Sequence, residues 1–307
     1  MNLFIFGLGY SATSFVNLVA QDIVKNGGFV AATTRSQEKA EVIIAKGLRA
    51  HIFDGTKAGD ATMLEDLAQA THIVTSISPP VDENEGDPVL AHHLKDIQAS
   101  NNLEWIGYYS TVGVYGDHDG AWVDEHAELK PVSARSIARV SAEKEWMVLG
   151  ESMNVPVALI RLAGIYGPGR NGFVNFKTGR ARRIIKPGQV FNRIHVEDIA
   201  AITESAARLK LGGVFNGADD EPAPPQDVVE YAANKMGVPV PPDIPFEEAN
   251  LSPMGRSFYG ETKRVGNSRL KDALKLTLKY PTYRDAFDAL WASNTWDQTP
   301  DLKAIEQ

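Results

Sequence analysis

The sequence predicts an α/β fold: a doubly wound parallel sheet with a smaller C-terminal lobe. Short apolar or β-branched runs alternate with amphipathic stretches over the first two thirds of the chain, which indicates repeated βα units. A glycine-rich turn follows the first of these runs at once. From about residue 217 the pattern changes to proline-rich connectors around short helical segments, which predicts a lobe without a sheet core of its own.

Six segments have the composition of buried strands, namely 3–6, 30–33, 50–53, 73–76, 105–110 and 157–161. The stretches between them include helical patterns at 37–46, 63–70 and 136–149. Six strands with crossover helices are enough to fill a doubly wound sheet. We therefore assign the sheet domain to residues 1–165, with residues 190–217 returning to it, and the lobe to residues 166–189 and 218–307.

Composition and charge exclude several classes of protein. The 307 residues carry 31 Lys and Arg against 39 Asp and Glu, and the resulting net charge of −8 repels nucleic acid and acidic lipid. The absence of cysteine excludes disulfides and thiolate chemistry. No stretch reaches the roughly 20 apolar residues of a membrane span, and the start does not read as a signal peptide. We expect a cytoplasmic protein that binds a small molecule, not nucleic acid or a membrane; a homodimer stays open.

A phosphate-binding turn is predicted between the first strand and the first helix. Gly7, Gly9 and Ala12 form a Gly-x-Gly-x-x-Ala pattern there. Gly7 permits the tight turn, Gly9 lets the backbone approach a pyrophosphate, and Ala12 allows close packing of the helix on the strand. The helix start near Tyr10 and Ser11 directs free amides and the positive end of the helix dipole at the phosphates. Because a second strand follows this helix, we interpret the unit as a dinucleotide site.

The end of the second strand indicates which dinucleotide binds. An NAD-binding unit usually places an acidic residue here, but this chain has Thr34, Arg35 and Ser36. Hydroxyls and a guanidinium suit a 2′-phosphate, so we predict NADP(H), with NAD(H) as the alternative. The competing interpretation of Arg35 is a surface residue at a helix start. Asp54, at the end of the third strand, either contacts the adenine edge or caps the following turn.

Four ordered motifs give the chain a resemblance to a known family. They are Tyr-Ser-Thr-Val-Gly-Val-Tyr-Gly-Asp at 109–117, Arg-Leu-Ala-Gly-Ile-Tyr-Gly-Pro-Gly at 161–169, Ile-His-Val-Glu-Asp at 194–198 and Phe-Asn at 215–216. With the glycine turn, they resemble the extended and atypical short-chain dehydrogenase/reductases, the superfamily of the NAD-dependent epimerase/dehydratases, over nearly the whole chain. The resemblance implies a Rossmann sheet, a nicotinamide cofactor and a C-terminal substrate lobe.

The resemblance also implies site residues. In that family a Ser or Thr at the place of Thr111 hydrogen-bonds the substrate oxygen, and a Tyr-x-x-x-Lys pair on the next helix performs acid–base work. Here Arg135 and Arg139 stand where that tyrosine and lysine are expected. A guanidinium stays protonated near neutral pH, so Arg135 cannot donate the proton. Arg139 is left to hold ribose hydroxyls or pyrophosphate, and Ser78 joins the predicted cofactor contacts.

The missing tyrosine leaves the proton donor open. Tyr115 is one candidate, although the tyrosine of the Val-Tyr-Gly motif is mostly part of the loop wall in the resembling family; water is another. The acidic, proline-bounded loop 79–88 is expected to border the ligand crevice. The basic stretch 177–186 either attracts an anionic substrate or forms a solvated helix face. We predict no metal site.

Our leading hypothesis is an NADP(H)-dependent oxidoreductase of the atypical extended type that acts on an unidentified small carbonyl or alcohol. Thr111 polarises the substrate oxygen in this hypothesis, and Tyr115 or water supplies the proton. Two alternatives stay open. The first is a non-catalytic NADP(H)-binding sensor or scaffold, which the loss of the tyrosine favours, and the second is a nucleotide-sugar epimerase or dehydratase.

Overall fold

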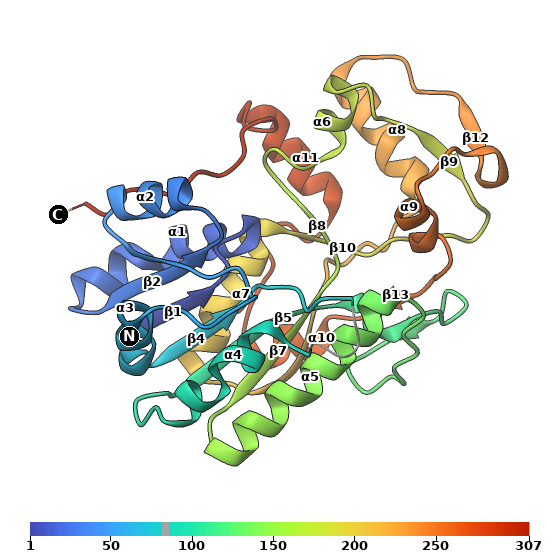
Figure 1. Cartoon of the computed structure of the whole chain (residues 1–307). Coiled ribbons are helices and arrows are strands. Elements are labelled where there is room, and N and C mark those ends of the chain that lie inside the picture. The colour runs from blue at the N-terminus through green and yellow to red at the C-terminus, as the bar shows by residue number, and fades with distance from the viewer. Residues whose placement is uncertain (82–85, 307) are drawn as a thin grey trace.

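The structure is a computed structural model, and it describes residues 1–81 and 86–306. Its centre is a parallel sheet with the strand order β11-β7-β5-β4-β1-β2-β3 (Figure 1). These strands are β1 (Asn2–Phe6), β2 (Phe29–Thr34), β3 (Arg49–Ile52), β4 (His72–Thr75), β5 (Trp105–Thr111), β7 (Val157–Leu162) and β11 (Gly213–Gly217). The predicted α/β class and the doubly wound parallel sheet are confirmed.

The winding of the sheet changes direction between β1 and β4. β1 pairs with β2 on one side and with β4 on the other, and the chain proceeds outward from this point in both directions. Open α/β sheets bind ligands at such a switch point, beyond the carboxyl ends of the strands. The expected cofactor crevice therefore lies beyond Phe6 and Thr75, the last residues of β1 and β4.

Helices cover both faces of the sheet, because alternate side chains of a strand enter different cores. The helices are α1 (Tyr10–Lys25), α2 (Gln37–Ala45), α3 (Ala61–Gln69), α4 (Pro88–Gln98), α5 (Ala134–Met153) and α7 (Val196–Leu209). In β1, Leu3 and Ile5 pack with side chains of α1 and α7. Phe4 and Phe6 pack with side chains of α3, α4 and α5 on the other face (Figure 1).

The C-terminal lobe has two apolar clusters of its own. Its elements are α6 (Gly172–Lys177), β9 (Arg183–Ile185), α8 (Pro225–Met236), β12 (Asp243–Pro245), η2 (Phe246–Glu248), α9 (Pro253–Phe258) and α11 (Tyr283–Ala292). The larger cluster joins α6, α8 and α11 and includes Phe173, Ala232 and Phe287. The smaller one includes Ile184 of β9 and Tyr259. Helices thus supply most of the lobe core, but β9 and β12 form a parallel pair that the sequence did not predict.

Several short segments connect the lobe with the sheet domain. They are η1 (Val112–Tyr115), β6 (Trp122–Val123), β8 (Gly164–Tyr166), β10 (Arg193–His195), β13 (Arg264–Val265) and α10 (Ser268–Leu274). β8 pairs with β10, and β6 pairs with β13.

The end of the described chain returns to α1. Leu302 is buried in the sheet core, and Asn17 of α1 both donates to and accepts from the backbone of residues 301–303, at 2.8 Å in each case. Gln21, one turn later, holds Glu306 in the same way. These residues pack on the sheet domain, although their place in the sequence suggested the lobe. No helix in residues 1–81 or 86–306 has the length and apolar character needed to cross a membrane.

Candidate functional site

The glycine turn after β1 is tight on one side and open on the other. Gly7 has φ +86°, and a Cβ added to it would meet the Ile77 side chain at 2.8 Å. The Gly7 amide donates to the Thr33 hydroxyl at 2.8 Å, which ties the turn to β2. A Cβ added to Gly9 would find its nearest neighbour, the Ser76 hydroxyl oxygen, only at 4.0 Å. The backbone at Gly9 therefore leaves room for a ligand.

The first helix begins at this open side without a side-chain cap. Its N-cap is Gly9, so the amides of Tyr10 and Ser11 have no side-chain acceptor. The Tyr10 hydroxyl donates to the carbonyl oxygen of Pro168 at 2.9 Å, which leaves this residue its backbone amide for ligand binding. Free amides, the helix dipole and the open space beside Gly9 together fit the pyrophosphate of a dinucleotide.

Two cations lie where α2 begins, beside the glycine turn. Arg35 is exposed, and Ser36 caps the helix by accepting from the Lys39 amide at 3.4 Å. The Lys39 ammonium donates to the carbonyl oxygen of Leu8, within the turn. Burial, and secondly the charge of Arg35, lower the pKa of Lys39. Lys39 was not predicted from the sequence; the signal that could have found it is a second cation four residues after Arg35, in the first turn of the following helix.

Two other residues expected near the adenosine have local roles in the structure. Thr34 is buried, and its carbonyl oxygen accepts from the Phe53 amide at 2.9 Å. The Asp54 carboxylate accepts from the hydroxyl of Thr56 at 2.7 Å and from its amide at 2.9 Å, and these bonds lower the pKa of Asp54. Of the two interpretations of Asp54, the structure therefore has the turn cap. Contact with adenine stays a prediction.

Thr111 ends β5 with its hydroxyl available to a substrate. Its Oγ1 accepts from the Gly113 amide at 3.1 Å and caps η1, so the hydroxyl proton is left to be donated elsewhere. A Cβ added to Gly113 would lie 3.4 Å from Oγ1 of Thr111 and 3.0 Å from Oγ of Ser136, so the two hydroxyls flank this glycine. Sequence reasoning missed Ser136, because only the packing of α5 against η1 brings it here.

Tyr115 is fully buried, and its assignment as a replacement acid is corrected. Its hydroxyl donates to Oδ1 of Asn216 at 2.7 Å and accepts from Nη1 of Arg161 at 2.9 Å. Arg161 is itself paired with Glu143 at 2.8 Å, in a buried ion pair. Burial raises the pKa of Tyr115. A phenol held between two buried partners supports the loop and does not reach a substrate.

Arg135 and Arg139, which the resemblance aligns with an acid–base pair, both lie on α5. Arg139 donates to the hydroxyl oxygens of Ser78 at 2.7 Å and Tyr108 at 3.0 Å. The structure thus brings together Ser78 and Arg139, two residues that the sequence predicts as cofactor contacts. Arg135, one turn earlier, is exposed and directs Nη1 to the sulfur of Met254 in α9 at 3.2 Å. This contact joins α5 to the lobe.

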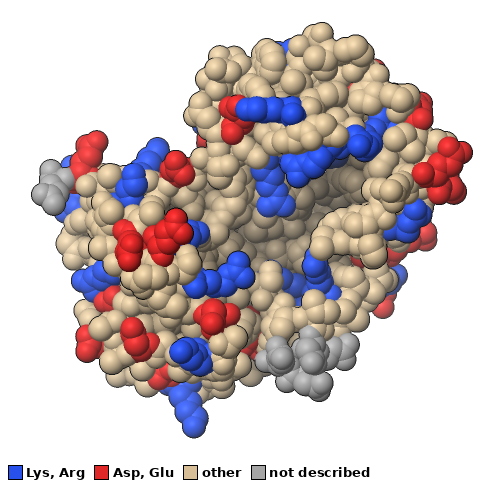
Figure 2. All heavy atoms as spheres, turned by 45° about the horizontal axis from the view of Figure 1, so that its top comes forward, with Lys and Arg blue, Asp and Glu red and all other residues tan. Residues whose placement is uncertain are grey.

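The basic stretch 177–186 is only partly neutralised. Lys177 pairs with Asp297 at 2.7 Å, and Arg183 pairs with Glu230 at 2.9 Å. Arg180 and Arg182 are exposed; Arg180 donates to the hydroxyl of Thr178, and Arg182 donates to backbone carbonyl oxygens. On the face shown in Figure 2, Lys and Arg side chains gather along the edge of a hollow, while Asp and Glu lie mostly away from it.

The expected crevice loop is described only in part. Its residues 82–85 lie outside the described residues, and Asp87 caps α4 by accepting from the Val89 and Leu90 amides at 2.9 and 3.2 Å. Within the described part of the chain, no three His, Cys, Asp or Glu side chains are placed to hold a metal ion.

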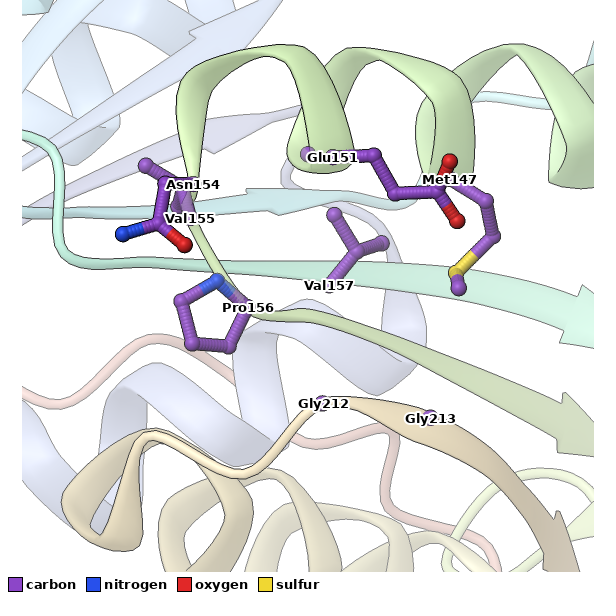
Figure 3. Close-up of a pocket in the computed structure, with 9 residues that line it drawn as sticks. Met147, Glu151, Asn154, Val155, Pro156, Val157, Gly212 and Gly213 are labelled. Carbon is purple, nitrogen blue, oxygen red and sulfur yellow. The ribbon is translucent and has the colours of Figure 1, made fainter.

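A separate pocket of about 290 Å³ lies at the other end of the sheet (Figure 3). It is lined by the last turns of α5 and by the amino ends of β7 and β11, including Met147, Val157 and Gly213. The glycine turn lies beyond the carboxyl end of β1, at the opposite edge of this parallel sheet. Glu151 is the one ionisable side chain in the lining. This pocket is therefore distinct from the cofactor crevice.

Comparison with solved structures relates this fold to known proteins. A conserved protein from Silicibacter pomeroyi DSS, described as functionally unknown, is 44% identical; the match covers 95% of this chain and 99% of that one, with a TM-score of 0.83. This chain belongs to the same family as that protein. No protein-family model matches the chain.

Solved structures with lower sequence identity also share the fold of this chain. The dTDP-glucose 4,6-dehydratase from Bacillus anthracis str. Ames, in complex with NAD, is 16% identical, with a TM-score of 0.75 over 96% of this chain and 97% of that one. The human epimerase family protein SDR39U1, with NADPH, is 16% identical, with a TM-score of 0.69 over 95% of this chain and 99% of that one. They confirm the predicted resemblance to the epimerase/dehydratases at the level of the fold.

Two curated proteins match parts of the chain. An uncharacterized UDP-glucose epimerase, YtcB, from Bacillus subtilis (strain 168) is 26% identical over 35% of this chain and 36% of its own length. A 3-diazoavenalumate denitrifying reductase from Streptomyces sp is 26% identical over 48% of this chain and 51% of its own length. The chain thus spans about a third and about half of these two relatives.

Proposed function

We propose that this chain is an NADP(H)-dependent oxidoreductase that reduces or oxidises a small carbonyl or alcohol. One observation carries the proposal: the uncapped start of α1 beside Gly9, the cations Arg35 and Lys39, and the hydroxyl of Thr111 follow strands of one parallel sheet at its carboxyl edge. The nicotinamide dinucleotides in the complexes of two fold neighbours support the cofactor class. A curated relative named as a reductase supports the reaction class.

Positive charge near the end of β2 supports a preference for NADP(H) over NAD(H). Arg35 directly precedes the N-cap of α2 and Lys39 lies in its first turn, and neither forms an ion pair with a carboxylate among the described residues. A 2′-phosphate would neutralise both cations with strong, charge-assisted hydrogen bonds. No acidic residue ends β2 to accept from the ribose 2′-hydroxyl of NAD, and Asp54, after β3, is engaged by Thr56.

The chain's own residues then have defined tasks. When bound, the nicotinamide supplies or accepts a hydride at the substrate carbon. Thr111 donates a hydrogen bond to the substrate oxygen, which gains a proton in reduction and loses one in oxidation. We assign this proton exchange to water, because Tyr108, Tyr109 and Tyr115 are buried and burial raises the pKa of each.

The test begins with binding and continues with turnover. Nucleotide fluorescence titrations of the pure protein are expected to give a lower Kd for NADPH than for NADH. Incubation with NADPH and a panel of small carbonyl compounds, both neutral and acidic, is then expected to consume NADPH only when the right carbonyl is present. Thr111→Val should reduce this turnover without weakening NADPH binding. Equal affinity for both nucleotides, or failure to bind either, would contradict the proposal.

Two other functions have support in specific observations. Arg135 in place of the family's tyrosine favours a non-catalytic NADP(H)-binding sensor or scaffold. Tight NADPH binding with no turnover across the panel would favour this function. The curated relative named as a UDP-glucose epimerase favours a nucleotide-sugar enzyme. That function predicts that a UDP-sugar at millimolar concentration raises the Tm of the protein, and an unchanged Tm would exclude it.

A further inference from the structure

Arg135 and Arg139 lie four residues apart near the start of α5. We propose that Arg135 and Arg139 bind the oxyanion of an acidic substrate, either a carboxylate or a phosphate. The inference rests on the proposed function, because this pair borders the same crevice as the nicotinamide. It adds the substrate class, which is a carbonyl compound or alcohol with an acid group next to the reacting oxygen.

Arg139 is oriented entirely by neutral groups. Nη2 donates to the Ser78 hydroxyl at 2.7 Å, while Nη1 donates to the Tyr108 hydroxyl at 3.0 Å and to the carbonyl oxygen of Tyr109. The guanidinium also lies over the Tyr108 ring, 5.5 Å from its centroid. These contacts fix the group but leave its charge in place. A fixed guanidinium is well suited to an oxyanion, because its donors match two oxygens at once.

Arg135 adds a second charge to the same region. It precedes Arg139 by four residues, so both side chains emerge on one face of α5. Its guanidinium donates to the Met254 sulfur at 3.2 Å, a weak and neutral acceptor. Like charges at this spacing disfavour a helix, and an anion between them would remove the repulsion. Arg135 also lies in the first turn of α5, where the helix dipole favours negative charge.

Two acidic side chains close to Tyr108, Glu143 and Asp87, have other partners. The charges of Asp87 and Glu143 each raise the pKa of Tyr108, whose hydroxyl accepts a hydrogen bond from Arg139. Glu143 is paired with Arg161 at 2.8 Å. The Asp87 carboxylate accepts from two amides at the start of α4, and burial raises its pKa. No described carboxylate therefore neutralises either arginine.

The position of Ser136 relates the pair to the reacting oxygen. Ser136 follows Arg135 directly in α5, and its hydroxyl and that of Thr111 flank Gly113, at 3.0 and 3.4 Å from a Cβ added there. Because α5 packs against η1, which Thr111 caps, the first two turns of α5 that carry Arg135 and Arg139 lie near the end of β5. This arrangement favours 2-oxo and 2-hydroxy acids, or phosphorylated counterparts, over neutral ketones.

The test uses the full chain saturated with NADP⁺ and three probes. Oxamate carries a carboxylate beside an amide carbonyl, oxamide is its neutral counterpart, and inorganic phosphate represents the phosphorylated substrates. Binding is measured by saturation-transfer NMR and calorimetry. We expect oxamate to bind more tightly than oxamide, and Arg135→Gln or Arg139→Gln to weaken oxamate binding by about tenfold to a hundredfold. Phosphate binding that exceeds oxamate binding and depends on the same arginines supports the site and identifies phosphate as its ligand.

Matched variants separate this site from a general charge effect. Lys144→Gln removes one positive charge from the exposed side of the same helix and should leave oxamate binding unchanged. Arg135→Lys keeps the charge but loses the forked donors, so it should bind oxamate with intermediate affinity. This conservative variant also keeps the test usable if a glutamine variant fails to fold.

NADPH titrations of every variant distinguish failure of this inference from failure of the proposed function. Lost oxamate binding with retained NADPH affinity supports a substrate site. Equal oxamate binding by Arg135→Gln and Lys144→Gln, or no binding of oxamate and phosphate by the unmodified protein, overturns the inference while the cofactor proposal stands. A loss of NADPH affinity as large as the loss of oxamate affinity also overturns it, because the pair would then serve the cofactor.

Discussion

Lys39 donates a hydrogen bond from its ammonium group to the carbonyl oxygen of Leu8, so α2 holds a cation against the glycine turn. The contact links α2 to the turn that follows β1. A second cation, Arg35, lies between β2 and α2, two residues before the first residue of α2.

Lys39→Ala is expected to weaken NADPH binding about tenfold or more and to change NADH binding by less than about twofold. The 2′-phosphate, present in NADPH alone, would lose a charged donor. Fluorescence titration with both nucleotides measures the effect. Lys25→Ala, at the far end of α1, is the matched control and should bind both nucleotides normally. Equal losses for the two nucleotides would show that Lys39 supports the turn and not the phosphate.

Arg35→Asp is expected to reverse the nucleotide preference. The new carboxylate would repel the 2′-phosphate and could accept from the ribose 2′-hydroxyl of NADH. We expect the ratio of the NADPH Kd to the NADH Kd to rise by about a hundredfold, because a charge-assisted hydrogen bond to the 2′-phosphate is lost and a charge repulsion is gained. Calorimetry on both nucleotides measures this ratio. An unchanged ratio would leave Arg35 as a surface residue.

Tyr115→Phe is expected to cost stability and not binding. Removal of the hydroxyl leaves Asn216 and Arg161 each without one buried partner, which lowers the free energy of unfolding by about 1–3 kcal/mol. Chemical denaturation measures the loss, and NADPH titration should show an unchanged Kd. Tyr231→Phe, which removes a hydroxyl from a more accessible contact with Asp288, should cost less. Normal stability with lost turnover would instead restore Tyr115 as an acid.

His195 is expected to make stability depend on pH. Burial lowers its pKa to about 4 from the usual 6.5, so the unfolded chain binds a proton in this interval that the folded chain does not. Relative to His195→Asn, the free energy of unfolding should rise by about 3 kcal/mol between pH 4 and 6.5. Denaturation of both proteins across this range measures the difference.

Comparison with His195→Asn is needed because Asp198 changes the free energy of unfolding with pH in the opposite direction. Burial raises the pKa of Asp198 to about 6, so its contribution to stability falls as pH rises from about 4 to 6. This contribution is present in both proteins and cancels in the difference. A difference between parent and variant that does not vary with pH would mean that folding leaves the pKa of His195 near its usual value.

Most strands could be predicted because their signal is local. The expected segments 3–6 and 157–161 correspond to β1 (Asn2–Phe6) and β7 (Val157–Leu162), since strands buried on both faces read as continuous apolar runs. β11 was less legible, because glycines stand at both of its ends and Asn216 interrupts its apolar run. Only the family resemblance, through the Phe-Asn motif at 215–216, indicated this strand. The pair β9–β12 was missed, because it forms between segments about sixty residues apart, as in Arg183↔Asp243.

Some residues of the candidate site could be predicted from the sequence and others could not, because only some of them depend on local signals. The glycine turn and the charge at Arg35 could be read directly, because they depend on backbone conformation and side-chain type at single positions. Tyr115 could not be placed, since its surroundings come from Arg161 and Asn216, on two strands far along the chain. Ser136 went unnoticed for the same reason.

The sequence by itself determined the glycine turn after the first strand, the basic character at the end of the second strand, and the two arginines at positions 135 and 139. Only the tertiary structure decided which polar groups meet: Lys39 with Leu8, Tyr115 with Arg161, and the hydroxyl of Ser136 beside that of Thr111. The reason is physical. Residue type and local conformation are encoded over a few neighbouring positions, whereas burial and hydrogen-bond partners depend on segments that packing brings together from distant parts of the chain.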